Sequence, residues 1–272
     1  MEETKELKEI MTEEELAKKY LEAFEFIRGL GFTKNYETLV GPFTMGIAMT
    51  KPPKPVGKED FDAKIDELMK TRPYELPENL SDELKNVVRE GDVLRYHRIY
   101  FNNLLIHYVF IKNASLGNRV KEFQNPAAIS KTIIVDKATI PDDADEKFKS
   151  VEMVGMIVIG DTNPAITNVS RGHVLDHEFA HVMLANTLLH TSDEQWETYN
   201  NLVVKGLGDH FNTFEEFLCD FTPYDSTVVN RFKVSPIAKF SDAMKEFFKD
   251  EVIDAYVPIV KAIAPFYDAM TE

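Results

Sequence analysis

The sequence contains a single cysteine, Cys219, among its 272 residues. No disulfide can therefore form within the chain, and the fold is not expected to need an oxidising compartment. Basic residues are also scarce, because 31 Lys and Arg stand against 46 Asp and Glu, for a formal net charge of -15. This balance argues against a nucleic-acid partner, since phosphate binding needs clustered basic side chains.

Long apolar runs are missing as well. No stretch approaches the roughly 20 apolar residues that a membrane-spanning helix needs. The first twenty residues are charged and lack the apolar core of a signal peptide. We therefore expect no membrane partner and a cytoplasmic location, with release by a route that reads no cleavable signal as the alternative. The sequence does not determine the oligomeric state.

The N-terminal third has helical patterning. Apolar side chains recur at helical spacing over residues 11–32, where Thr12 and Glu15 have the spacing of a capping box and Gly29 lies at the end. Two more helices are predicted beyond a proline-rich break, over residues 58–71 and 82–90. These patterns predict a helical N-terminal segment over residues 1–90.

The middle of the chain is rich in β-branched and aromatic residues, as strands are. Four strands are predicted, over residues 93–101, 104–113, 131–140 and 151–161. Asn102 and Asn103 separate the first two, which indicates a hairpin, and from Ser170 onward the pattern is helical. Segregated runs of this kind favour an α+β fold. We expect a small mixed or antiparallel sheet beside an active-site helix, followed by a helical C-terminal part, in a domain over residues 91–272.

The segment 173–184 reads HVLDHEFAHVML and carries an H-E-x-x-H pattern. On a helix, His177 and His181 lie one turn apart, so both imidazoles can reach one metal ion about 2 Å from each nitrogen. Glu178 lies off that axis and can reach a water molecule at the metal instead. The spacing therefore predicts a zinc site with Glu178 as the general base.

A third ligand must come from another part of the chain. A histidine at 187 with a glycine at 184 would complete the metzincin pattern, but these positions hold Thr187 and Leu184. The segment 212–221, NTFEEFLCDF, offers Glu216, with Asp220 one helical turn further on the same face. A carboxylate at that place can accept the free ring N–H of a ligand histidine and fix its tautomer.

HEFAH followed by a helix bearing Glu-x-x-x-Asp resembles the gluzincin metallopeptidases. The gap from His181 to Glu216 is longer than in the thermolysin-like members and closer to that of the lethal-factor protease domain and the clostridial neurotoxin light chains. The resemblance covers residues 173–221. It implies a zinc-dependent peptidase, of the endopeptidase rather than the exopeptidase type, that acts on a protein or peptide substrate and holds one Zn²⁺ per chain. The roles carried over are zinc ligands at His177, His181 and Glu216, a general base at Glu178, and an acid orienting a ligand histidine at Asp220.

The same resemblance leaves the oxyanion-stabilising residue open. Thermolysin-like enzymes use a late histidine, but no histidine follows His210 in this chain. Tyr199, His210 and Tyr224 are the candidates, and we name His210 and Tyr224 with Glu178 as the catalytic residues. Gluzincins also commonly lay the substrate along an edge strand beside the metal, a place that the strand over 151–161 would fill.

Plain structural explanations compete with this reading. Thr213 as an N-cap with Glu216 three residues later would form a capping box, which explains the glutamate without a metal. Asp220 would then be a solvated helix residue. Structural roles are also expected for His97, His107, Cys219 and the acidic loop over residues 142–147. The whole fold could serve as a catalytically weak or inactive binding or structural module, although such a role has no need of Glu178.

Overall fold

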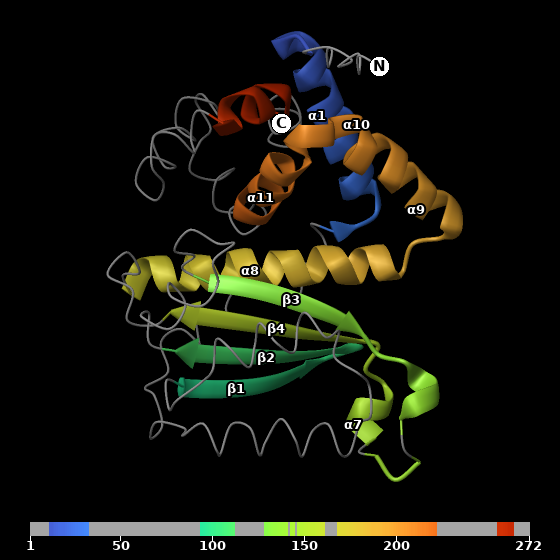
Figure 1. Ribbon diagram of the computed structural model, residues 1–272, viewed down its shortest axis with the longest axis vertical. Helices are drawn as coiled ribbons and strands as arrows, with labels where there is room; N and C mark the ends of the chain where they lie inside the picture. The colour runs from blue at the N-terminus through green and yellow to red at the C-terminus, as the bar shows by residue number, and fades with distance from the viewer. Residues whose placement is uncertain are drawn as a thin grey trace, which may run out of the picture. The chain divides into compact units, whose positions relative to one another are not determined.

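The computed structural model describes residues 11–32, 93–111, 128–140, 142–144, 146–160, 168–221 and 255–263. The chain divides into two compact units, one of Met1–Thr33 with His190–Glu272 and one of Lys34–Leu189. Helices and one four-stranded sheet make up the described elements (Figure 1), which confirms the predicted α+β class. The helices predicted over 58–71 and 82–90, and the boundary predicted after residue 90, lie outside the described residues.

The sheet belongs to the second unit and is mixed. β1 (Val93–Phe101) and β2 (Leu104–Ile111) form the predicted antiparallel hairpin, turned at Asn102 with φ +45°, a conformation that asparagine adopts more readily than most residues. β4 (Met153–Gly160) pairs in parallel with β2 and antiparallel with β3 (Ala128–Ile134). The resulting order is β1-β2-β4-β3, with β4 in the interior.

Two expectations about these strands are wrong. The strand predicted over 131–140 ends at Ile134, because Asp136 caps a 3-10 turn, η1 (Lys137–Thr139), by accepting a hydrogen bond of 2.9 Å from the backbone N–H of Ala138. The strand predicted over 151–161 is not an edge strand, because β4 is paired on both sides. Within the described sheet the edges are β1 and β3.

The long helix α8 (Asn168–Leu189) packs on one face of this sheet, where it contacts β3 and β4 (Figure 1). Gly155 on β4 permits the close approach, since a β-carbon there would lie 2.9 Å from Cγ1 of Val182 on the helix. Phe179 meets Phe101 of β1 edge-on, with ring centroids 5.9 Å apart. These contacts fix which side of α8 faces the sheet.

A polar contact adds to this attachment. The side-chain amide of Asn103, in the hairpin turn, donates to Oδ1 of Asn186 on α8 at 2.9 Å and to Oε2 of Glu152 at 3.1 Å. The backbone carbonyl of Asn103 accepts from the N–H of Glu152 at 2.7 Å. One turn residue thus joins the hairpin, the start of β4 and the motif helix.

The opposite face of the sheet has its own apolar cluster. Leu105 and Val154, which are paired across β2 and β4, pack there with Phe148 of the short helix α7 (Glu146–Lys149). Side chains alternate between the two faces of a strand. The sheet is therefore buried on both faces, and it holds α8 on one of them.

In the first unit, α1 (Glu13–Gly29) begins at the predicted capping box. Oγ1 of Thr12 accepts from the N–H of Glu15 at 3.2 Å, and Oε2 of Glu15 accepts from the N–H of Thr12 at 2.9 Å. The helix ends before Gly31, whose φ of +85° favours glycine. Its buried face carries Tyr20, Ala23, Phe24 and Ile27.

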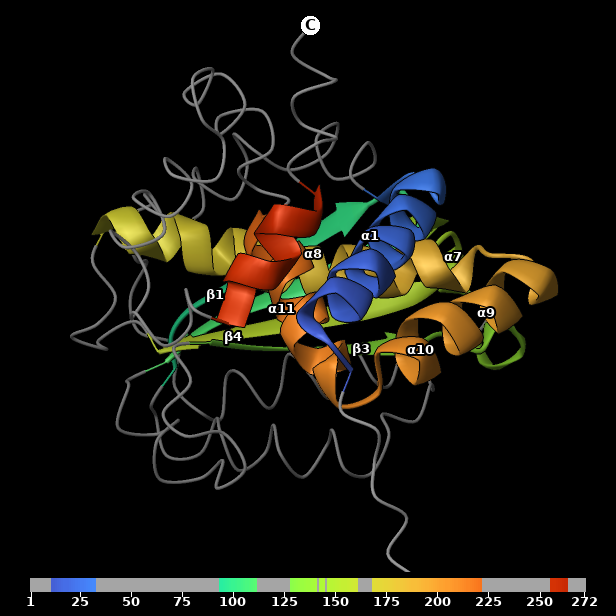
Figure 2. The same ribbon diagram turned by 90° about the horizontal axis from the view of Figure 1, so that it is seen from above.

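The remaining described elements of this unit are helical: α9 (Asp193–Tyr199), the π-helical turn η2 (Asn200–Val204), α10 (Lys205–Leu207), the 3-10 turn η3 (Gly208–His210), α11 (Phe211–Phe221) and a helix over residues 255–263. Ser192 and Gln195 form a second capping box, at the start of α9. α1 packs against α9 and α10 (Figure 2), and Tyr20 stacks on Phe214 with centroids 5.7 Å apart. No helix in the described part of the chain has both the length and the apolar character needed to cross a bilayer.

Candidate metal centre

The H-E-x-x-H motif lies on one uninterrupted helix, as predicted, because α8 spans Asn168–Leu189. Successive residues of a helix are about 100° apart around its axis, so His177 and His181 lie about 40° apart. By the same geometry they lie roughly opposite Phe179 and Val182, the side chains that contact the sheet. The packing of α8 on the sheet therefore turns both histidines away from it.

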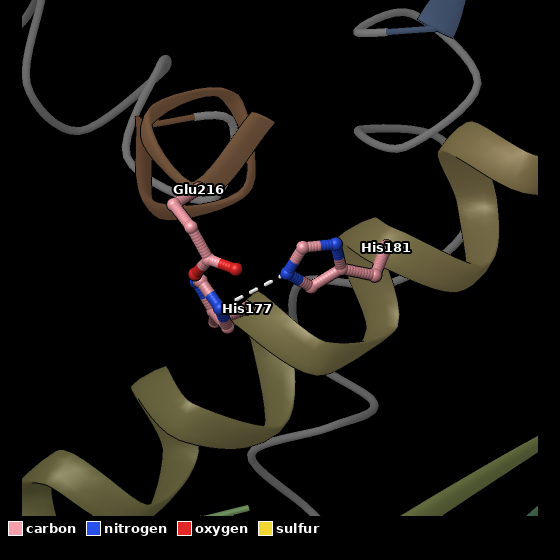
Figure 3. Close-up of side chains that lie close together, drawn as sticks. All are labelled: His177, His181 and Glu216. Atoms are coloured by element: carbon pink, nitrogen blue, oxygen red, sulfur yellow. Dashed lines mark hydrogen bonds between the residues drawn. The ribbon is translucent and has the colours of Figure 1, made fainter. Parts of the chain in front are cut away.

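The two imidazoles face each other across one helical turn. Their Nε2 atoms are 3.2 Å apart and the rings are nearly perpendicular, with an interplanar angle of 80° (Figure 3). Two nitrogens that each lie about 2.0–2.1 Å from a tetrahedral zinc ion are separated by about 3.3 Å. The separation of the two nitrogens is therefore compatible with their binding one ion.

Glu178 follows the first histidine directly and is buried, with 7% of its surface exposed. Its position on the helix lies between the side that carries the histidines and the side that faces the sheet. A buried carboxylate beside two histidines that could bind a metal ion is a candidate proton acceptor.

Glu216 is exposed on α11. The helix begins at Phe211, directly after η3, so Thr213 is its third residue and not its N-cap. The capping box proposed for Thr213 and Glu216 is therefore wrong, and it does not account for the glutamate. One ligand atom from each of His177, His181 and Glu216 lies within 4.8 Å of the others (Figure 3).

The two adjacent glutamates of α11, Glu215 and Glu216, affect the pKa values of two different tyrosines. Burial, and then the charges of Glu215 and Cys219, raise the pKa of Tyr199. Burial, and then the charge of Asp220 and its hydrogen bond, raise the pKa of Tyr256, and Glu216 adds to this effect. Glu216 therefore shares the side of α11 that carries Asp220, as the four-residue spacing predicts.

Asp220 is buried, with 5% of its surface exposed. Its Oδ2 accepts a hydrogen bond of 2.8 Å from the hydroxyl of Tyr256. Asp220 is therefore not a solvated helix residue, whereas its neighbour Cys219 is fully buried, as expected of a core residue. Tyr256 was not among the predicted site residues, because no local pattern links two residues so far apart in the sequence.

The candidates for the oxyanion-stabilising residue differ in their surroundings. His210 ends η3, is half-buried, and lies edge-on to Tyr20 with centroids 6.3 Å apart. Tyr199 is buried and stacks on Trp196 at 5.7 Å. Tyr224 lies outside the described residues. The choice among the three stays a prediction.

The two hairpin histidines lie on opposite faces of the sheet. His97 is paired with Tyr108, and His107 is paired with Arg98, the next residue along β1. Nδ1 of His107 lies 2.6 Å from the hydroxyl of Tyr96, at hydrogen-bond distance. This separation keeps His97 and His107 from sharing a ligand.

Two imidazole nitrogens and a carboxylate form a donor set that suits zinc and also other divalent transition metals, iron among them. The separation of the histidine nitrogens fits zinc, and the carboxylate at Glu178 fits hydrolytic chemistry. No protein-family model matches the sequence, and neither a curated protein nor a solved structure matches it.

Proposed function

We propose that this protein is a zinc-dependent peptidase in which His177, His181 and Glu216 bind the metal and Glu178 is the general base. The observation that carries the proposal is the motif helix, where two histidine Nε2 atoms lie 3.2 Å apart and a buried glutamate follows the first of them. A module that only bound a partner would need neither this pair nor the buried carboxylate.

Each side chain has a defined task in this proposal. Zinc held by these residues would polarise a peptide carbonyl and lower the pKa of a water molecule. Glu178 accepts the proton of the attacking water and then gives it to the departing amine. His177 and His181 would be neutral ligands and Glu216 the one anionic ligand, so a Zn²⁺ ion held there would keep a net positive charge that could stabilise the developing oxyanion.

The sheet supports a peptide as the substrate. β3 pairs with β4 on one side only within the described sheet, and α8, the helix of the two histidines, packs beside it. An extended peptide can add to such an edge by main-chain hydrogen bonds, which depend little on its side chains. We therefore assign β3, and not β4, as the strand that receives the substrate.

The metal is tested first. Protein purified without chelators is analysed by emission spectroscopy, and about one zinc per chain is expected. His177→Ala should abolish this stoichiometry, because two ligands hold zinc much more weakly than three. Iron in place of zinc, or no metal in the wild type, would contradict the proposal.

The chemistry is tested with the wild type and Glu178→Gln side by side. Both are incubated with a library of peptides from a digested proteome, and new termini are identified by mass spectrometry. Glu178→Gln should keep its zinc and lose turnover by orders of magnitude, since residue 178 is not a ligand. Glu197→Gln, at an exposed position of α9, is the matched control and should cleave like the wild type. Equal cleavage by Glu178→Gln and the wild type would show that Glu178 is not the general base.

A further inference from the structure

Tyr256 forms a buried contact with α11 from a distant part of the chain. It lies on the helix over residues 255–263, and its hydroxyl donates to Oδ2 of Asp220 at 2.8 Å. Both side chains are only 5% exposed. The ring of Phe217 meets the ring of Tyr256 edge-on, with centroids 5.4 Å apart. This packing also restrains the position of the Tyr256 side chain.

This hydrogen bond matters because Asp220 is buried. A carboxylate out of water needs hydrogen-bond donors, and a donor to a charged acceptor contributes more than a neutral pair does. Burial, with the charges of Asp220 and Glu216, raises the pKa of Tyr256 far above its ordinary value, so its hydroxyl keeps the proton and remains a donor. The contact therefore holds the Asp220 carboxyl group in one orientation.

We infer that Tyr256 is a positioning residue of the metal centre, which holds the Asp220 carboxylate so that its second oxygen can accept the ring N–H of a ligand histidine. A carboxylate can accept hydrogen bonds at both oxygens, and the hydroxyl of Tyr256 occupies Oδ2. The inference rests on the proposed function. It makes the helix over residues 255–263 part of the site, although this helix carries no ligand.

The test is the zinc affinity of Tyr256→Phe, measured by competition with a fluorescent chelator. The change removes one oxygen and keeps the ring that packs on Phe217. We expect affinity to fall by about 3–10-fold, somewhat less than the roughly 10–100-fold for losing a direct partner of a ligand. Tyr20→Phe is the matched control and should leave affinity unchanged, since Tyr20 is equally buried and stacks on Phe214 of the same α11.

A double-mutant cycle separates positioning from general packing. In an Asp220→Ala background, Tyr256→Phe should cause no further loss of zinc affinity, because its target is gone. The visible spectrum of the Co²⁺-loaded protein should shift in Tyr256→Phe and stay unchanged in Tyr20→Phe.

Several outcomes would overturn the inference. They are wild-type affinity in Tyr256→Phe, an equal loss in Tyr20→Phe, or the same loss with and without Asp220. If His177→Ala still abolishes zinc binding in that case, the proposed function stands and only the role of Tyr256 fails. A wild-type protein that binds no zinc would overturn both.

Discussion

Gly155 and Val182 touch at the interface that holds the motif helix on the sheet. A β-carbon at position 155 would lie 2.9 Å from Cγ1 and 3.2 Å from Cγ2 of Val182. Valine has one strongly preferred rotamer in a helix, so its methyl groups cannot turn away cheaply. Gly155→Ala should therefore lower the free energy of unfolding by roughly 1–3 kcal/mol, measured by urea denaturation.

Gly29→Ala is the control for this change, because a β-carbon at Gly29 meets nothing within 4 Å. On the last turn of α1 it should be neutral or slightly stabilising. In a Val182→Ala background, which removes both methyl groups, Gly155→Ala should cost less than in the wild type. An unchanged cost in that background would mean that the contact with Val182 is not the cause.

The third ligand is tested by two neighbouring substitutions on α11. Glu216→Gln should sharply reduce zinc affinity, because a neutral amide is a poor zinc ligand. Glu215→Gln should keep zinc, since its side chain points about 100° away around the helix axis. Chelator competition measures both. The reverse result would mean that Glu215, and not Glu216, is the third ligand. If both variants bind zinc as tightly as the wild type, α11 supplies no ligand.

Asp220→Ala should weaken zinc binding by roughly 10–100-fold, because a ligand histidine loses the group that orients it. The variant should also be less stable without metal, since the buried hydroxyl of Tyr256 loses its acceptor. Chelator competition and urea denaturation of the metal-free protein measure the two effects. A loss of stability without any loss of zinc affinity would make Asp220 purely structural.

His97 should make stability depend on pH. Burial, and then the charge of Arg95, lower its pKa below the ordinary 6.5, and its buried Nε2 finds no hydrogen-bond partner among the described residues. The unfolded chain therefore binds the proton first, so the stability present above pH 6.5 is lost as the pH falls below it. Urea denaturation between about pH 7 and 5 should show a steeper loss in the wild type than in His97→Phe. Parallel curves would contradict a neutral His97 with a buried Nε2 atom.

Local patterns predicted their elements well. Both capping boxes that open α1 and α9 formed because each involves residues three apart, and a helix start is decided within its first turn. The hairpin turned at Asn102 for a similar reason, since a short turn between two strand-like runs depends on few residues. The helix that carries the H-E-x-x-H motif could be predicted from the helical periodicity of its own residues.

Features that depend on distant pairing were missed. The resemblance predicts an edge strand at β4, but its partner β2 lies much earlier in the sequence. The unbroken apolar run MVGMIVIG is typical of a strand buried on both faces. The capping-box spacing at Thr213 was misleading because η3 leads directly into α11 and starts the helix earlier. The contact of Tyr256 with Asp220 arises only from tertiary packing.

The proposed metal centre is tested most directly by anomalous diffraction at the zinc absorption edge, from crystals of the full chain grown with zinc. The expected result is one strong peak within about 2.3 Å of Nε2 of His177, Nε2 of His181 and a carboxylate oxygen of Glu216. A peak at other residues, or none beside the two histidines, would contradict the assignment of this protein as a zinc peptidase.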